Sequence, residues 1–397
     1  MVKVSIVIPT RNRAHLLYYA LRSALKQTFD DFEVVVCDNF SKDETAELTH
    51  RHANPKIVYT RTSMPLSMPD NWEYALRYAR GEYITFLTDD SYLLSDALTV
   101  AMTEVERAKA QVAVWKHSAY FSSAWLEPAR RNLLYVPRAT SKSFMLDSQR
   151  GLRELYNNPQ QPLVPKALNS ICHRSVIEKV ISVQGRFFLP SCPDYTSAAG
   201  VLLNVPEYLF IDRPLFIDGV TTASIGANVQ FNGGASAQDF LKEFGQDLSE
   251  VLFLGIPTCT AGIAMSLEGV KKYYPGACPP LNKNKVLNRV VDDLARLQVN
   301  GVNVGEHWKT INRHLANQPN SVRFSAATQR VVSALKWHTV RIVRSSPRLE
   351  LLEKLRGIEI ISGAGAGFSN IEESSKVVMN QLAKVRSPDP STRRAEA

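Results

Sequence analysis

The chain has 397 residues, of which 45% are hydrophobic and 21% are charged, and its formal net charge is +9. The composition is that of an ordinary globular protein, and the length is too great for one small core and predicts about two domains. The basic balance favours anionic partners such as nucleotide phosphates, acidic membrane faces or nucleic acid, without choosing among them.

Cysteine usage and hydropathy exclude two further classes. The five cysteines show no C-x-x-C spacing, which argues against a zinc site or a disulfide framework, and we expect the reducing cytoplasm as compartment. Met1 leads directly into a strand, so we expect no signal peptide. No apolar run reaches the roughly 18 residues that cross a bilayer, and the nearest, residues 251–265, is broken by Gly255 and Pro257. The sequence therefore does not predict an integral membrane protein.

The first hundred residues alternate between strand and helix patterns. The β-rich runs are residues 4–8, 34–37, 57–59 and 83–87. Helical periodicity recurs at residues 16–25, 43–52, 72–79 and 95–109, and Gly81 is interpreted as the C-terminal cap of the third helix. This order predicts an α/β fold with a doubly wound, mostly parallel sheet.

The rest of the chain is less regular. Residues 112–225 read as mixed strands and loops with many prolines, Gly233-Gly234 indicates a boundary, and the pattern from Ser236 onward is helical. We therefore predict a first domain at 1–225, a helical C-terminal region at 236–386, and a disordered tail at 387–397.

Polar clusters follow three of the predicted strands. They are Thr10-Arg11-Asn12, Asp38-Asn39 and Thr88-Asp89-Asp90. An isolated aspartate pair is more often a solvated turn, but three polar clusters at one edge of a parallel sheet describe a ligand cleft. A nucleoside diphosphate fits it: Asp38 would accept from a base or ribose, and Asp90 would hold a divalent cation against the diphosphate. Neither a P-loop nor a G-x-G-x-x-G motif is present.

With these clusters in place, the chain resembles the family 2 glycosyltransferases, which have the GT-A fold. The matching residues are Val4 to Arg13; Ser23 with Gln27, Thr28 and Phe29; Phe32 to Ser41; Asn71; Ala79 to Ile84; and Thr88-Asp89-Asp90. The resemblance is strong over residues 1–110 and weak over 111–225. It implies that 1–225 is a catalytic domain with a nucleotide-binding half at 1–110 and an acceptor half at 111–225. It implies an inverting enzyme that uses Mn²⁺ or Mg²⁺. The chain is similar to the non-processive members of the family, because the Q-x-x-R-W motif of the processive members is missing.

The resemblance also implies roles for individual residues. Pro9, Thr10, Arg11 and Asp38 would line the nucleotide pocket. Asp90 would bind the metal in a DXD-like acidic motif, and Asp89 would lie nearer the ribose or donor sugar. Two departures matter: Asp38-Asn39 stands where the family usually has two acids, and the Thr-Asp-Asp motif is shorter than D-x-D-D. The choice of nucleotide therefore stays open.

Transfer to an alcohol needs a general base, for which Asp194 is the candidate. It lies in a proline-stiffened loop before the helix-like segment 198–203, and the resemblance gives an acid at this position that role. The alternative is an N-cap for that helix. Asp212 and Asp218 are rivals, although Asp212 is expected to pair with Arg213. His173 is a further candidate for the acceptor side.

Residues 321–357 combine Lys and Arg with apolar side chains and Trp337 at helical spacing. This pattern predicts either a helix packed on the catalytic domain with a solvated basic face, or a helix on an anionic membrane surface. The second would place the protein peripherally on the inner face of the membrane.

These observations predict an enzyme that moves one sugar from a nucleotide-sugar donor to a hydroxyl of a glycan or lipid-linked acceptor. We expect no nucleic-acid partner, and the oligomeric state is left open. The alternatives are a nucleotidyltransferase, which would want a glycine-rich loop where Pro9 to Arg13 has none, and a non-catalytic nucleotide-binding or scaffold protein that kept the fold.

Overall fold

A computed structural model describes residues 2–140, 142–158, 163–190, 192–232, 252–344 and 357–386 of the chain. Eleven strands of this described part form one sheet. They are β1 (Val4–Thr10), β2 (Phe32–Asp38), β3 (Ile57–Arg61), β4 (Tyr83–Phe86), β5 (Tyr92–Leu93), β6 (Val112–Phe121), β7 (Leu133–Pro137), β8 (Ser143–Asp147), β9 (Ser170–His173), β10 (Glu207–Val220) and β11 (Ile358–Ser362).

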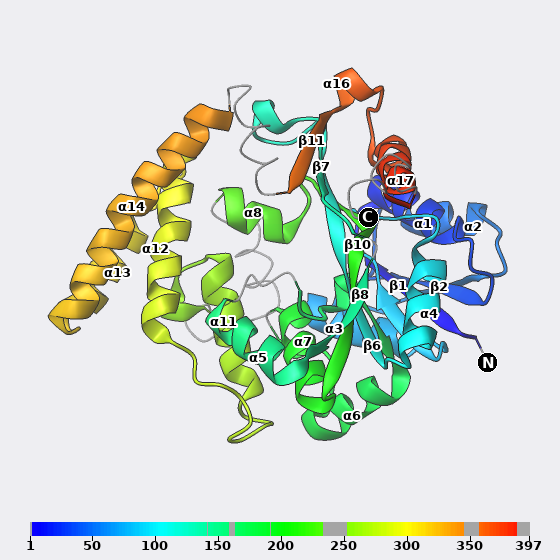
Figure 1. Cartoon of the computed structure of the whole chain (residues 1–397), viewed down its shortest axis with the longest axis horizontal. Helices are drawn as coiled ribbons and strands as arrows, with labels where there is room; N and C mark the ends of the chain where they lie inside the picture. The colour runs from blue at the N-terminus through cyan, green and yellow to red at the C-terminus, as the bar shows by residue number, and fades with distance from the viewer. Residues whose placement is uncertain are drawn as a thin grey trace, which may run out of the picture.

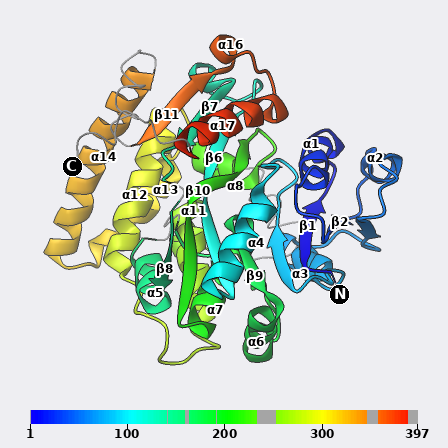
Figure 2. The ribbon, with the colours of Figure 1, turned by 45° about the vertical axis from the view of Figure 1, so that its right-hand side comes forward.

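Helices lie on both faces of the sheet (Figures 1 and 2). Those of the first half and middle of the chain are α1 (Ala14–Leu25), α2 (Thr45–Arg51), α3 (Met68–Leu76), α4 (Ala97–Ala108), η1 (Pro128–Arg130), α5 (Ser148–Asn157), η2 (Ala167–Asn169), α6 (Arg174–Gln184), α7 (Pro193–Asn204) and α8 (Ile225–Asn232). Those nearer the C-terminus are η3 (Phe253–Gly255), α11 (Cys259–Val270), α12 (Lys283–Val299), α13 (Gly305–Ala316), α14 (Asn320–Arg344), α16 (Gly363–Ala366) and α17 (Ile371–Arg386).

The strands β3, β2, β1 and β4 lie next to one another in this order and are all parallel. The strands that follow β4 in the chain pair mainly antiparallel with their neighbours. Strand β9, for example, is antiparallel to both β4 and β6, whereas β10 runs parallel to β6. The central strands are buried over their whole length, which explains why they are rich in valine and isoleucine instead of alternating with polar residues.

Three buried clusters hold these layers together. One side of the sheet packs on α1, α4 and α17, and the other side packs on α3, α5, α6, α7 and α11. A third cluster joins α11 to α12, α13 and α14, which form an outer layer on the left of Figure 1. The predicted α/β fold, with a doubly wound sheet followed by a helical C-terminal region, is confirmed.

The C-terminal segment returns to the sheet. Strand β11 pairs antiparallel with β7 at the sheet edge, and α17 packs on α1, where Glu372 pairs with Arg22 at 3.2 Å and with Lys26. The region predicted to be helical therefore also contains one strand. The boundary at Gly233-Gly234, the helix pattern beginning at Ser236, residues 345–356 of the basic segment and the tail 387–397 lie outside the described residues, so these predictions stay predictions.

Gly81 has a role other than the predicted one. Helix α3 ends at Leu76 with Arg77 as its C-cap, so Gly81 is not its terminator. A Cβ atom at Gly81 would overlap the backbone of Val4 and Ser5 in β1. This glycine is needed because the chain passes very close to β1 just before β4 begins.

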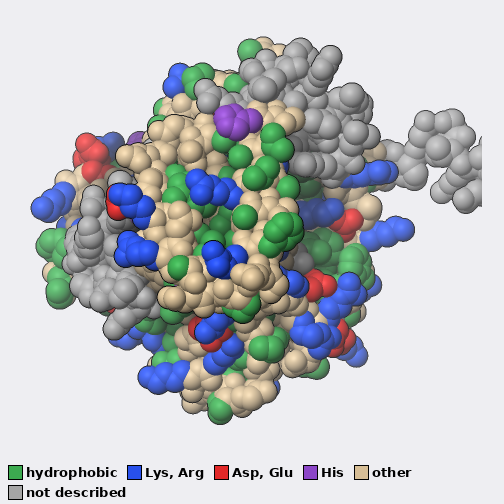
Figure 3. Space-filling view, turned by 90° about the vertical axis from the view of Figure 1, so that its left-hand side faces the viewer, with side chains coloured by type: hydrophobic (Ala, Val, Ile, Leu, Met, Phe, Trp, Pro, Cys, Tyr) green, Lys and Arg blue, Asp and Glu red, His purple; other side chains and the backbone are tan. Residues whose placement is uncertain are grey.

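Within the described ranges, none of the helices combines the length and the apolar composition that spanning a membrane requires. The outer side of the molecule, which carries α14, faces the viewer in Figure 3.

Candidate active site

The strand order reverses between β1 and β4, because β2 and β3 lie on one side of β1 while the later strands lie on the other. In open α/β sheets the crevice at such a switch point, at the carboxyl ends of the strands, is where ligands bind. Thr10, the last residue of β1, donates a hydrogen bond of 2.8 Å to the Asp89 carboxylate that follows β4. The bond joins two of the predicted clusters at the carboxyl ends of the neighbouring strands β1 and β4. Pro9 lies buried beside Thr10, and Arg11 follows it half-buried.

Asp38 ends β2 one strand further along the same edge, where it is paired with Thr10 in the sheet register. Its side chain is fully buried and accepts hydrogen bonds from the Ser41 amide at 2.7 Å, the Tyr59 hydroxyl at 2.7 Å and the Arg61 guanidinium at 3.1 Å. A carboxylate has about four acceptor sites, so one is left for a ligand. A ligand reaches it only if a covering side chain such as that of Arg61 moves aside.

Asn39, which stands where the resemblance leads one to expect an acid, has a structural role. Its side-chain amide donates to the Leu66 carbonyl at 2.8 Å and accepts from the Leu66 amide at 2.8 Å. The two bonds fasten the loop before α3 to the end of β2. An aspartate could accept but not donate here, so this position favours asparagine.

Asp89 is held by two donors. Besides Thr10, the Arg13 guanidinium pairs with it at 3.1 Å, and the other end of Arg13 donates to the backbone carbonyl of Ala223, beyond β10. Burial disfavours the charge of Arg13, but the carboxylates of Asp89 and Asp90 raise its pKa above the ordinary value. Arg13 was not among the predicted site residues, and its place two residues after Arg11 was the only signal for it.

Asp90, which follows Asp89 directly, has a raised pKa. Its side chain is buried, and burial together with the charges of Asp89 and Asp218 raises its pKa to about 7, although Arg13 and the Thr88 side chain act in the opposite direction. An aspartate with such a pKa lacks enough donors or cations to offset its charge.

Gly219 explains how Asp90 comes to lie so close to β10. A Cβ atom at Gly219 would overlap the backbone carbonyl of Asp90. The absence of a side chain at Gly219 therefore lets β10 bring the neighbouring Asp218 carboxylate to the acidic pair.

Asp194 is the second residue of α7, and Cys192 is the N-cap, so Asp194 is not the N-cap of this helix. Burial raises the pKa of Asp194, while the Lys166 ammonium acts to lower it. Lys166 lies 5.0 Å from the ring centroid of the adjacent Tyr195. The first turn of a helix also favours a negative charge. Asp194 is thus an acid with a raised pKa and a cation nearby.

His117 is influenced by two charges that also act on the two acidic positions. Burial lowers the pKa of His117, the Asp218 carboxylate acts to raise it, and the Lys166 ammonium acts to lower it. Asp218 also raises the pKa of Asp90, and Lys166 also lowers that of Asp194, so these groups influence one another electrostatically. The sequence named Asp218 only as a rival base and did not indicate His117 or Lys166.

The expected pairing of Asp212 with Arg213 is wrong. Asp212 pairs with Lys116 and accepts from Thr140 at 2.6 Å, whereas Arg213 pairs with Asp96 at 2.6 Å. The two residues lie where β10 shifts its register against β6, between Ile211 and Pro214.

His173 is not on the acceptor side either. It caps the N-terminus of α6 and lies opposite Tyr83, the first residue of β4. This is the end of the strand away from Asp89 and Asp90.

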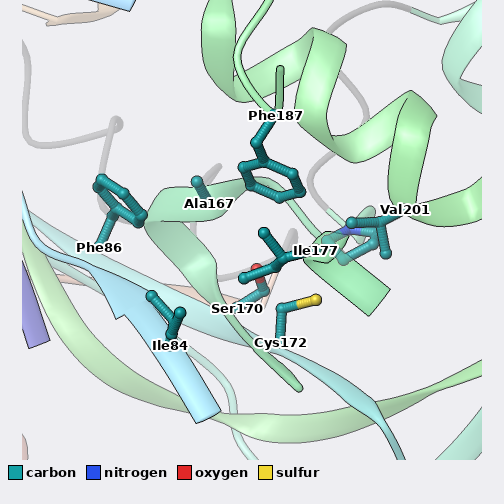
Figure 4. A pocket seen from close by; sticks show the side chains of 9 residues that line it. Ile84, Phe86, Ala167, Ser170, Cys172, Ile177, Phe187 and Val201 are labelled. Atoms are coloured by element: carbon teal, nitrogen blue, oxygen red, sulfur yellow. The ribbon is translucent and has the colours of Figure 1, made fainter. Parts of the chain in front are cut away.

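A small apolar pocket lies on the side of the sheet that packs on α6 and α7 (Figure 4). Its lining includes Ile84 and Phe86 of β4, Cys172 of β9 and Val201 of α7, and none of the predicted site residues. In the ranges that the structure describes, no group of three or more His, Cys, Asp or Glu side chains could hold a metal ion by itself.

Residues 5–177 match the model of the family described as Glycosyl transferase family 2. A Campylobacter jejuni protein named GalNAc(5)-diNAcBac-PP-undecaprenol beta-1,3-glucosyltransferase is 36% identical over 115 residues, which are 28% of this chain and 37% of that protein. The Escherichia coli UDP-Glc:alpha-D-GlcNAc-diphosphoundecaprenol beta-1,3-glucosyltransferase WfaP is 28% identical over 106 residues, 27% of this chain and 42% of that protein.

Among solved structures, S. aureus TarS 1-349 in complex with UDP-GlcNAc superposes with a TM-score of 0.48 at 15% identity, over 85% of this chain and 92% of that one. The match to the two curated relatives spans only about two fifths of their length. The family match over residues 5–177 contains Thr10, Asp38, Asp89 and Asp90. Residues 5–177 of the chain are therefore similar to glycosyl transferase family 2.

Proposed function

We propose that this chain transfers one sugar, with inversion, from a nucleotide-sugar donor to a hydroxyl group of a glycan or lipid-linked acceptor. The observation that carries the proposal is the hydrogen bond between Thr10 and Asp89 across the switch point, with Asp90 beside it, inside the segment that matches the family. Two relatives are named for undecaprenol-linked substrates, and one name includes UDP-Glc, which supports a lipid-linked acceptor and a uridine nucleotide.

The donor would lie over the ends of β1, β2 and β4. Pro9, Thr10 and Arg11 would line the nucleotide pocket, and the remaining acceptor site of Asp38 suits one N–H of a base or one ribose hydroxyl. Asp89, fixed by Thr10 and Arg13, would face the ribose or donor sugar. A carboxylate held at both oxygens is preorganised to accept hydrogen bonds from hydroxyl groups without rearranging.

A divalent cation suits the residues around Asp90. A buried carboxylate with a raised pKa and two acidic neighbours is offset by a cation. Mg²⁺ is commonly bound by one or two carboxylates together with substrate phosphates, so Asp90 would suit a cation delivered with the diphosphate. When bound, Mn²⁺ or Mg²⁺ would stabilise the charge of the departing nucleoside diphosphate.

Asp194 would act as the general base. A raised pKa brings a carboxylate closer to the pH at which proton transfer is most effective, and the nearby Lys166 ammonium favours its ionised form. Asp218 acts on both His117 and Asp90, and Lys166 acts on both His117 and Asp194, which supports placing the acceptor hydroxyl near these groups.

Donor binding is tested first, by calorimetry with UDP, GDP, CDP and dTDP, with and without Mn²⁺, followed by the intact nucleotide sugars. We expect metal-dependent binding of one nucleotide and slow hydrolysis of its sugar. Asp90→Ala should abolish both metal-dependent hydrolysis and transfer. Binding of no nucleotide under either condition would overturn the proposal in favour of a scaffold, and pyrophosphate release from a nucleoside triphosphate and a sugar phosphate would favour a nucleotidyltransferase.

The base is tested by Asp194→Asn, which should retain donor binding and lose transfer. Asp212→Asn is the matched control, because Asp212 is already engaged by Lys116 and Thr140. Near-normal turnover of the Asp194 variant would show that the base is another residue.

A further inference from the structure

Helix α14 packs against the rest of the protein with one side only. On that side Ala326 and Ser333 are buried, and Asp292 of α12 accepts from Ser333 at 2.6 Å and from the Trp337 indole at 3.1 Å. Arg330 stacks on Trp308 of α13 at 4.1 Å. These contacts fix the rotation of the helix and therefore which side chains face outward.

The outward side carries a stripe of large apolar side chains. Phe324 is 75% exposed, Val331 61% and Leu335 65%, and their spacing of i, i+7 and i+11 places them on one face of the helix. Val332, next to the stripe, is 51% exposed. Single exposed apolar residues are ordinary, but a continuous stripe marks an interaction surface. We call these four residues the α14 stripe.

The charged side chains of helix α14 are all basic. Residues 320–344 contain five Lys or Arg and no Asp or Glu. At 3.6 residues per turn, Arg323 and Arg330 lie along one flank of the α14 stripe and Lys336 lies along the other. Arg323 is exposed, and the Lys336 side chain is 50% exposed although it pairs with Asp292 at 3.2 Å. Figure 3 looks onto this side, where hydrophobic and Lys or Arg side chains lie next to one another.

We propose that the outer face of α14 binds an anionic lipid surface, with the α14 stripe in the headgroup–acyl boundary and the flanking cations on lipid phosphates. A helix with apolar side chains on its outer face and cations along both flanks of that face matches an anionic membrane. Its acyl chains are apolar, and its headgroups carry negative charge. The helix lies at the left edge of the molecule in Figure 1, where α12 separates it from the sheet. It packs on α12 and α13 through the third buried cluster. The proposal does not depend on sugar transfer.

The experiment is flotation of the full chain with vesicles of phosphatidylcholine alone and of phosphatidylcholine mixed with phosphatidylglycerol, at low and at high salt. We expect binding to the mixed vesicles that weakens with salt. The variant Phe324→Ser/Val331→Ser/Leu335→Ser should bind at least about tenfold more weakly, because three inserted side chains are lost. Arg323→Gln should bind about fivefold more weakly, corresponding to about 1 kcal/mol per cation near the membrane surface.

Val183→Ser is the matched control, since Val183 is 43% exposed on α6. It should bind as the wild type does, and circular dichroism shows whether each variant keeps its helices. The single Arg323→Gln change, on an exposed side chain, keeps the test valid if the triple variant unfolds. Equal binding to both kinds of vesicle, unchanged binding of a folded triple variant, or a wild-type dimer that the triple variant converts to a monomer would each overturn the proposal, the last in favour of a second copy as occupant.

Discussion

Replacing Asp90 by asparagine should stabilise the metal-free protein, and the gain should grow with pH. The pKa of Asp90 is raised from 3.8 to about 7, by burial first and then by Asp89 and Asp218. The unfolded chain therefore loses this proton near pH 3.8 while the folded chain keeps it to about pH 7. Because the folded state binds more protons in that window, stability falls as the pH rises through it.

The size of the effect follows from the width of that window. At about 1.4 kcal/mol per pH unit, a pKa raised from 3.8 to about 7 means that burying Asp90 costs about 4 kcal/mol at about pH 8, where the folded carboxylate is ionised, and about 2 kcal/mol at about pH 5, where the folded state must keep the proton. With an unfolding entropy of about 2.1 cal/mol/K per residue, a chain of 397 residues gains about 1.2 °C in Tm per kcal/mol. Asp90→Asn should thus raise the Tm by about 5 °C at about pH 8 and by about 2 °C at about pH 5.

The assay is thermal unfolding in EDTA at both pH values, followed by circular dichroism. Asp31→Asn is the control, because Asp31 is exposed just before β2, and it should change the Tm at neither pH. A Tm for Asp90→Asn that is unchanged or lower at about pH 8, or a gain of equal size at both pH values, would refute the electrostatic account. Adding Mn²⁺ with the nucleotide at about pH 8 should then stabilise the wild type and not the variant.

Further predictions concern the neighbours of the two acids. Gly219→Ala should displace the backbone of Asp90 and lower kcat/KM about 100-fold, while Gly269→Ala, on an exposed part of α11 with open space around it, should leave activity unchanged. Lys166→Met should raise the pKa of Asp194 further, because the ammonium group that lowers it is removed. The acidic limb of the pH–rate profile should then move to higher pH with little change at alkaline pH, and an unshifted limb would mean that Asp194 is not the titrating base.

The nucleotide-binding half could be predicted from the sequence because its signals are local. Each strand is a short apolar run, each helix follows within a few residues, and parallel strands end at the same edge. Thr10, Asp38 and Asp89 therefore had to converge once the strand order was known. The hydrogen bond between Thr10 and Asp89 joins residues 79 positions apart, yet each belongs to the polar cluster at the carboxyl end of its strand.

The remaining contacts depend on segments that have no local relation to one another. Asp218 and Lys166 reach the site from β10 and from the loop before η2, and only the register of β10 against β6 aligns Asp218 with the cleft. Gly81 resembled a helix cap because glycine serves both for caps and for close backbone contacts, and the sequence does not distinguish the two uses. Strand β11 is short and follows a long helical stretch, so nothing near it in the sequence points to β7.

The three acids at the strand ends are buried to a similar degree, but their charges are compensated in different ways. Asp38 has three hydrogen-bond donors, and Asp89 has the Thr10 hydroxyl and the Arg13 guanidinium. Asp90 instead lies next to the charges of Asp89 and Asp218, and its pKa is raised to about 7. A carboxylate in that situation is stabilised either by a proton or by an added cation, and a nucleoside diphosphate bound beside it would favour the cation. This difference in compensation, more than the acidic motif itself, supports assigning the metal to Asp90 and the sugar nucleotide to Asp89.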